Sequence, residues 1–219
     1  MEKMPYQSER RVVTTTPTAS PEGHAADWRF GVPALTGSLV TGRELRMSDA
    51  RSLLVALSTE EVTRFISPPP ATVEAFESFI ARTHQQRAAG RAVCFGIVPR
   101  GLDGAVGLVQ IRALESDFGL SEWGFALASE FWGSGAFVDA AQLVVKFGFE
   151  RLGIHRLEAR ADVRNGRGNG VLRKIGAVQE GVLRRSFFRA GEHLDQALWS
   201  ILIDEWPRQM PVSPVLRLH

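Results

Sequence analysis

The chain has 219 residues, of which 44% are hydrophobic and 23% are charged, a balance typical of one folded domain with an apolar core. The formal net charge of +2 is too small to indicate nucleic acid as the main partner. The single cysteine, Cys94, excludes an internal disulfide and fits a reducing compartment. The sequence shows neither an apolar run long enough to span a membrane nor an apolar signal segment. We therefore expect a cytoplasmic protein whose partners include neither a membrane nor nucleic acid.

Polar, proline-containing sequence predicts an irregular N-terminal extension over residues 1–33, followed by one domain at 34–207 and a tail at 208–219. Near the end of the extension, four apolar side chains are expected to pack on the domain. They are Trp28, Phe30, Val32 and Leu35.

Within the domain, the hydrophobic pattern predicts about seven strands, several of them antiparallel, interleaved with about four helices. Ser48-Asp49 is expected to supply the N-cap of the first helix, and the strongly apolar helix after residue 134 is expected to be buried. This arrangement predicts an α+β domain with a mixed sheet. The predicted strands cover residues 40–47, 92–98, 105–113, 120–128, 156–163, 183–189 and 195–203, and the helices 49–57, 72–87, 134–152 and 168–175, with a short helical turn at 59–62.

A glycine-bearing turn, Trp132-Gly133-Ser134-Gly135-Ala136-Phe137, connects the strand at 120–128 to the buried helix. Glycine allows close approach to the backbone, and a helix N-terminus presents free N–H groups at the positive end of its dipole. The turn lacks the GK[ST] ending of an ATP-binding P-loop and the full G-x-G-x-x-G of a dinucleotide fold. Taken alone it predicts either an anion site or a purely structural turn.

A second glycine-rich turn runs from Asn165 to Gly170 and leads into another helix. With both turns in this order, residues 38–206 resemble the GNAT superfamily of acyl-CoA-dependent N-acetyltransferases, and most of all its Rim-type branch of ribosomal-protein N-terminal acetyltransferases. The likeness includes the Glu122-Trp123-Gly124-Phe125 strand, the Trp132-Gly133-Ser134-Gly135 turn, Leu152-Gly153-Ile154-His155-Arg156, Lys174-Ile175-Gly176, Glu180-Gly181-Val182-Leu183-Arg184 and Asp204-Glu205-Trp206.

The resemblance implies a GNAT-like fold and acetyl-CoA as co-substrate, without a metal. The pyrophosphate is then expected on the first turn and the pantetheine along the preceding strand, with Asn165 near the thiol end. One of Arg164, Arg167 and Arg173, which flank the second turn, is expected near the adenosine 3′-phosphate; a solvated basic face is the alternative for these arginines. The residues implied in binding are Phe125, Ala126, Leu127, Trp132, Gly133, Ser134, Gly135, Ala136, Phe137, Val138, Asn165 and Arg173.

This sequence departs from the family pattern at two positions. Phe137 stands where a glycine or alanine is usual, so its ring either crowds the phosphate site or turns into the core. Gly168 replaces a serine whose hydroxyl could assist the leaving thiolate. The general acid of many relatives is a tyrosine, and the only tyrosine here is Tyr6 in the N-terminal extension.

Direct acetyl transfer requires a free amine and a polarised thioester carbonyl. Glu122 is the candidate base, because strand alternation places it on one face with Gly124 and Ala126, opposite Trp123, Phe125 and Leu127. The alternative is a salt-bridged strand glutamate. For Asn165, proposed to assist at the thiol end, the alternative is an asparagine chosen for a turn or helix cap.

The acceptor is a primary amine, either a protein N-terminus or a small molecule, and fold and cofactor do not determine which. Its pocket is expected between residues 53–79 and 187–198, which carry Phe65, Phe76, Phe187 and Phe188 and few acids beyond Glu60, Glu61 and Glu192. A polycationic acceptor is therefore disfavoured. A non-catalytic acyl-CoA-binding or sensing module is the alternative function, and assembly as a homodimer is left open.

Overall fold

The computed structural model describes residues 27–189 and 191–206, and these form one eight-stranded sheet. Its strands are β1 (Leu35–Thr36), β2 (Val40–Glu44), β3 (Ala92–Pro99), β4 (Gly107–Ala113), β5 (Leu120–Leu127), β6 (Arg156–Asp162), β7 (Val178–Arg189) and β8 (Glu192–Leu202). They lie in the order β1-β2-β3-β4-β5-β6-β8-β7, and every neighbouring pair is antiparallel except the parallel pair β5–β6. The predicted mixed sheet is confirmed, with the short β1 as the additional strand.

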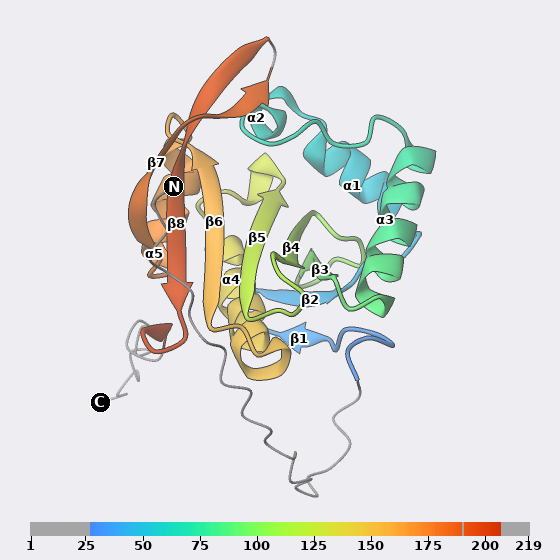
Figure 1. The fold of residues 1–219 in the computed structure, drawn as a ribbon. Helices are drawn as coiled ribbons and strands as arrows, with labels where there is room; N and C mark the ends of the chain where they lie inside the picture. Colours follow the sequence, from blue (N-terminus) through green and yellow to red (C-terminus); the bar gives the residue numbers. More distant parts are fainter. Residues whose placement is uncertain (1–26, 190, 207–219) are drawn as a thin grey trace, which may run out of the picture.

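The helices cover both faces of this sheet. They are α1 (Asp49–Leu57), α2 (Glu60–Thr63), α3 (Val73–Ala88), α4 (Ala136–Phe147) and α5 (Gly166–Lys174), with a 3-10 turn η1 (Ser129–Phe131) and a π-helical turn η2 (Gly148–Leu152). Figure 1 shows α1 and α3 beside the sheet on one side and α4 behind it on the other. Among the described residues, α2 is the one helix beyond the four that were expected, and the sequence predicted only a helical turn there. No described helix is long and apolar enough to cross a membrane.

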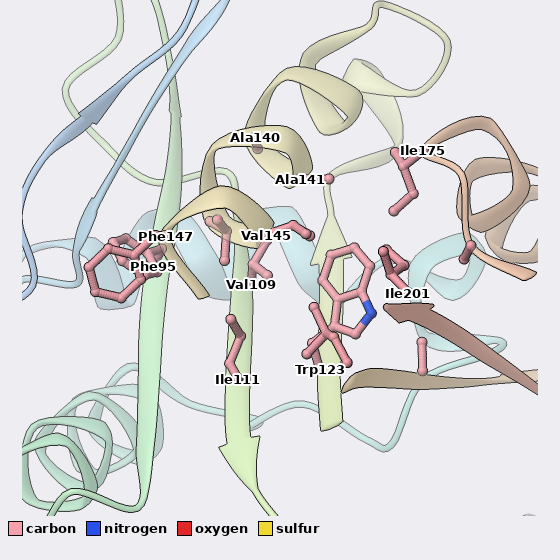
Figure 2. Packing of buried hydrophobic residues seen from close by; sticks show 14 of the residues in the cluster. Phe95, Val109, Ile111, Trp123, Ala140, Ala141, Val145, Phe147, Ile175 and Ile201 are labelled. Atoms are coloured by element: carbon pink, nitrogen blue, oxygen red, sulfur yellow. The ribbon is translucent and has the colours of Figure 1, made fainter. Parts of the chain in front are cut away.

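The larger apolar core lies between α4 and the sheet. Ala140, Ala141, Val144 and Val145 of α4 are at most 1% exposed, because apolar residues occupy nearly the whole circumference of this helix. Figure 2 shows α4 side chains above Val109 of β4 and its neighbours on the sheet. The predicted burial of this helix is confirmed.

A smaller core lies on the opposite face, between the sheet and the first three helices. Leu53 of α1, Val62 of α2 and Phe76 and Ile80 of α3 pack there against the sheet. Every residue of β3 is buried, since this strand has a core on each side. The two cores therefore share one central strand.

The start of the described chain packs on the larger core. Trp28 is 9% exposed and meets Phe118 edge to face at 5.3 Å between ring centroids, and Val32 and Leu35 pack against the same core. Phe30 is 88% exposed, so the expectation that it packs on the domain is wrong. Most of the predicted extension and tail, including Tyr6, lies outside the described residues.

The expected cap of α1 is also wrong. The side chain of Ser48 makes no capping hydrogen bond; the neighbouring Asp49 instead accepts from the N–H groups of Arg46 and Ala105 and from the guanidinium of Arg43. Burial alone would raise the pKa of Asp49, but these hydrogen bonds outweigh it and hold the pKa below its ordinary value. The carboxylate one residue further along thus joins the start of α1 to the sheet.

Candidate functional site

The central feature of the site is an opening between two parallel strands. The ladder between β5 and β6 covers only Leu120–Glu122 and Arg156–Glu158, so the rest of β5 has no strand partner on that side. A cavity of about 770 Å³ lies beside this free edge. Its lining comes from α2 and the residues just after it, the end of β5, the turn before α4 with the first residues of that helix, and α5 with its cap. The lining residues are Glu61, Val62, Phe65, Ile66, Phe125, Ala126, Leu127, Phe131, Trp132, Gly133, Gly135, Phe137, Val138, Asn165, Gly166, Arg167, Gly168, Gly170, Val171 and Lys174.

The turn before α4 presents free backbone donors to this cavity. Gly133 and Gly135 have φ angles of 78° and 88°, which residues with side chains rarely adopt, and Gly135 is the N-cap of α4. Within the described structure, the N–H groups of Gly133, Gly135, Phe137 and Val138 donate no hydrogen bond. Four unpaired donors at the positive end of a helix form a site suited to an anion.

The ring of Phe137 does not fill this turn. Phe137 is 9% exposed, and its ring lies 4.2 Å from that of Phe125 and 6.4 Å from that of Trp123 between centroids. Of the two expectations for this residue, burial in the core is confirmed. On the other side, Trp132 Nε1 donates to the carbonyl oxygen of Leu127 at 2.9 Å, which fixes the turn to the end of β5.

The second turn is shaped by a compact asparagine network. Asn165 caps α5 by accepting from the N–H of Gly168 at 2.8 Å, and Asn169 donates to the carbonyl oxygens of Asp162 and Asn165. Asn169 also accepts from Trp199 Nε1 of β8 at 2.9 Å. A Cβ on Gly168 would lie 2.5 Å from Asn165 Nδ2, so a serine at this position would displace the Asn165 amide. The glycine is what allows this cap to form.

Asn165 is used by the fold as a helix cap and also borders the cavity. Its Oδ1 is used in the cap, which is the alternative that the sequence offered, and the residue also lines the cavity. No hydrogen bond of the described residues uses its Nδ2 as donor. A role in catalysis stays a prediction.

Four cations surround the second turn, and they occupy different environments. Arg164 pairs with buried Asp162 at 3.0 Å, and Arg173 lies over the Trp199 ring at 5.6 Å. Arg167 lies 4.5 Å over the Trp132 ring and lines the cavity, as does Lys174. Of the three arginines that the sequence offered, Arg167 lines the cavity, whereas Arg164 and Arg173 are not among the lining residues.

Glu122 lies on the sheet face predicted for it. Ala126 packs with the smaller core and Phe125 with the larger one, so the predicted alternation of β5 is confirmed. The Glu122 carboxylate pairs with Arg112 of β4 and, at 3.6 Å, with Arg160 of β6, and it is absent from the cavity lining. This is the salt-bridged arrangement given as the alternative, and the role of Glu122 as base stays a prediction.

Neither the thiol of Cys94 nor a cluster of metal-binding side chains contributes to this site in the described residues. Cys94 is buried in the smaller core, and burial raises the pKa of its thiol to about 12, so it is a packing residue as expected. In residues 27–189 and 191–206, no three His, Cys, Asp or Glu side chains converge in a way that could hold a metal ion.

The acceptor side predicted from the sequence was too broad. Phe65 lines the cavity, but Phe76 is 1% exposed in the smaller core and Phe188 is 62% exposed on the hairpin of β7 and β8. The two expected walls meet close to α2, where the Arg189 guanidinium donates to the Ile66 carbonyl oxygen from 123 residues away. This contact joins the hairpin to the chain just after α2, and Figure 1 shows the hairpin of β7 and β8 near this helix.

Comparison with known proteins relates the chain to acetyltransferases. The acetyltransferase (GNAT) domain model matches residues 40–178. YoaA of Bacillus subtilis, named as an uncharacterized N-acetyltransferase, is 28% identical, with 78% of this chain and 97% of YoaA covered. YdaF of the same bacterium, whose name includes the words ribosomal N-acetyltransferase, is 27% identical, with 76% and 93% covered.

Among solved structures, RimJ of Mycobacterium smegmatis in complex with CoA-disulfide has the same fold. Its TM-score is 0.71 at 24% identity, with 80% of this chain and 87% of that chain covered. The match to the domain model spans more than half of the sequence. The fold is also that of RimJ, which was solved with CoA-disulfide bound. The chain therefore belongs to the GNAT acetyltransferase family.

Proposed function

We propose that this protein transfers an acetyl group from acetyl-CoA directly to a primary amine. The observation that carries the proposal is the set of unpaired N–H groups at Gly133, Gly135, Phe137 and Val138, which border the cavity at the start of α4. These donors suit a pyrophosphate, and backbone groups make a lysine in the turn unnecessary. Because the Phe137 ring packs against Phe125 in the core, it does not cover these N–H donors.

The free edge of β5 is the proposed place for the pantetheine arm. Phe125, Ala126 and Leu127 lie beyond the β5–β6 ladder and can pair with an extended ligand, with the Asn165 amide opposite them in the cavity lining. The amine nitrogen, once neutral, then attacks the thioester carbon; the C–N bond forms, the C–S bond breaks, the nitrogen releases its second proton to solvent, and CoA leaves as a thiolate that solvent protonates. Glu122, on the same face as Ala126, takes the proton of the ammonium group through water.

A pair of glycine variants tests the anion site. Gly133 and Gly101 both have positive φ angles, 78° and 83°, and a Cβ at either meets nothing within 4 Å, but only Gly133 lies in the turn. We expect Gly133→Ala to weaken acetyl-CoA binding at least tenfold in a calorimetric titration, on the order of 1.4 kcal/mol. Gly101→Ala should bind as the unsubstituted protein does, and equal affinities in both variants would contradict the proposed site.

A non-catalytic acyl-CoA sensor remains the second candidate, favoured by Gly168 and by the lack of a tyrosine in the described domain. Thiol release in the presence of amine acceptors separates the two. An enzyme should lose turnover in Glu122→Gln while it keeps its affinity for acetyl-CoA. A protein that binds acetyl-CoA but releases no thiol in the presence of any tested amine would be identified as a sensor.

A further inference from the structure

The charged side chains that line the cavity come from two different elements. Arg167 and Lys174, the lining cations, both belong to α5. Glu61 of α2 is the single carboxylate among the lining residues that the structure describes. The cations are thus contributed by α5 and the carboxylate by α2, and Arg167 lies over the ring of Trp132, in the turn proposed for the phosphates.

Apolar side chains next to Glu61 in the chain form a wall of the same cavity. Val62, Phe65 and Ile66, which follow Glu61 in the chain, line the same cavity. Val62 belongs to the smaller core, and Ala126 and Trp132 pack against that core. The wall is therefore next to the end of β5, along which the pantetheine arm is proposed to lie, and Figure 1 shows α2 near this end of the strand.

Glu61 is not used by the fold itself. In the described part of the chain it takes part in none of the ion pairs, whereas Glu122 is held by two arginines. An exposed carboxylate beside an apolar wall can meet an incoming ammonium without first breaking an internal pair. Attraction of this kind acts on recognition of the charged group.

We propose that Glu61 recognises the ammonium group of the acceptor and that Phe65 and Ile66 hold an apolar group beside it. This inference rests on the proposed function and names its acceptor class: a primary amine adjoining an apolar group, such as a peptide with an apolar first residue. A polyamine fits poorly, because its further charges would find no second carboxylate in the lining and would approach Arg167 and Lys174.

Two neighbouring glutamates provide the test. Glu60 and Glu61 are consecutive in α2 and both exposed, but only Glu61 lines the cavity. With a leucine-first tetrapeptide as acceptor, we expect Glu61→Gln to raise the acceptor KM roughly tenfold, with kcat and the KM of acetyl-CoA little changed. Glu60→Gln should retain all three constants. Equal acceptor KM values in the two variants would overturn the inference.

A panel of acceptors tests the apolar wall in the same protein. Tetrapeptides that begin with leucine, serine or aspartate are compared with spermidine, and kcat/KM should be highest for leucine, by roughly tenfold or more over serine. Phe65→Ala should reduce the leucine-to-serine ratio, while Phe30→Ala, at a residue 88% exposed outside the cavity, should not. Preference for spermidine would overturn the inference.

The same measurements separate this inference from the proposed function. If the unsubstituted protein acetylates any of these amines and Glu61→Gln matches Glu60→Gln, the inference fails and the proposed function stands. If acetyl-CoA binds but no amine is acetylated, the proposed function fails and the inference fails with it.

Discussion

Arg156 of β6 holds two carboxylates at once. Its guanidinium donates to both oxygens of Glu180 of β7, at 2.8 and 2.5 Å, and to Glu158 at 2.9 Å. Glu180 also accepts from Ser200 Oγ of β8 at 2.8 Å. The hydrogen bonds from Arg156 and then from Ser200 lower the pKa of Glu180 from 4.5 to about 2.

This lowered pKa predicts a dependence of stability on pH. The ionised Glu180 carboxylate contributes its full stabilisation of the folded state above pH 4.5. This contribution is lost as the pH falls from 4.5 toward about 2, because the Glu180 carboxylate takes up its proton in the unfolded chain before it does so in the folded protein. In urea unfolding, Glu180→Gln should be less stable than the unsubstituted protein near neutral pH, and the difference should shrink across this window. Glu130→Gln, at an exposed carboxylate that makes no described ion pair, should show no such convergence. A constant difference for Glu180→Gln would argue against the pairing.

Individual site residues differ in how far the sequence could define them. Gly133 and Gly135 were predictable, because a positive φ and close backbone approach are local requirements. The partners of Glu122 were not, since Arg112 and Arg160 lie on the two neighbouring strands and meet it only after the sheet has formed. Local chemistry can be read along the chain, whereas ion pairs across strands depend on register.

At the scale of elements, the start of α4 is held against the sheet by one carboxylate. Asp139, in the first turn of the helix, accepts from the N–H groups of Ser38, Leu39 and Val40 at 3.2, 2.7 and 3.0 Å. The contact is close enough that a Cβ on Gly37 would lie 2.3 Å from its Oδ2. Because the proposed phosphate donors lie at this end of α4, Asp139 positions them relative to β2.

Removal of this carboxylate should destabilise the fold. Asp139→Ala leaves three backbone donors without their acceptor, and we expect a loss of about 2 kcal/mol in the free energy of unfolding, measured by urea denaturation. Glu150→Ala is the control, because Glu150 makes only an exposed pair with Lys146 at 3.8 Å; it should cost no more than about 0.5 kcal/mol. Similar losses in both variants would show that the Asp139 contact contributes little.

The elements also show where periodicity is sufficient and where it fails. The buried helix was predictable from its apolar residues, although its α-helical part ends at Phe147 and a π-helical turn continues to Leu152. The first residues of β7 were missed, since the strand begins at Val178 and its ladder is interrupted between Gln179 and Gly181 and between Leu183 and Phe187. Bulges break the two-residue alternation on which a sequence pattern depends.

At the scale of the whole molecule, β3 joins the two apolar cores. Val93, Phe95 and Ile97 point into the core under α4, and Cys94 and Val98 into the core under α1 and α3. Loss of either core would expose one face of a strand that is buried throughout. We therefore expect the described domain to unfold in a single cooperative transition.

Each core carries its own natural probe, so this expectation can be measured. Trp28, Trp123, Trp199 and Trp206 lie in the larger core and report it by fluorescence, whereas Cys94 lies in the smaller core and reports it by reaction with a thiol reagent. Ile80→Val, in the smaller core, should cost about 1 kcal/mol and shift both probes to the same lower urea concentration. Ile111→Val, in the larger core, should do the same. If Ile80→Val instead exposed Cys94 at urea concentrations where the fluorescence is still native, the α1–α3 side would open separately from the rest. The acceptor wall on α2 would then belong to a unit less stable than the proposed acetyl-CoA site, and the two halves of the cavity would form independently.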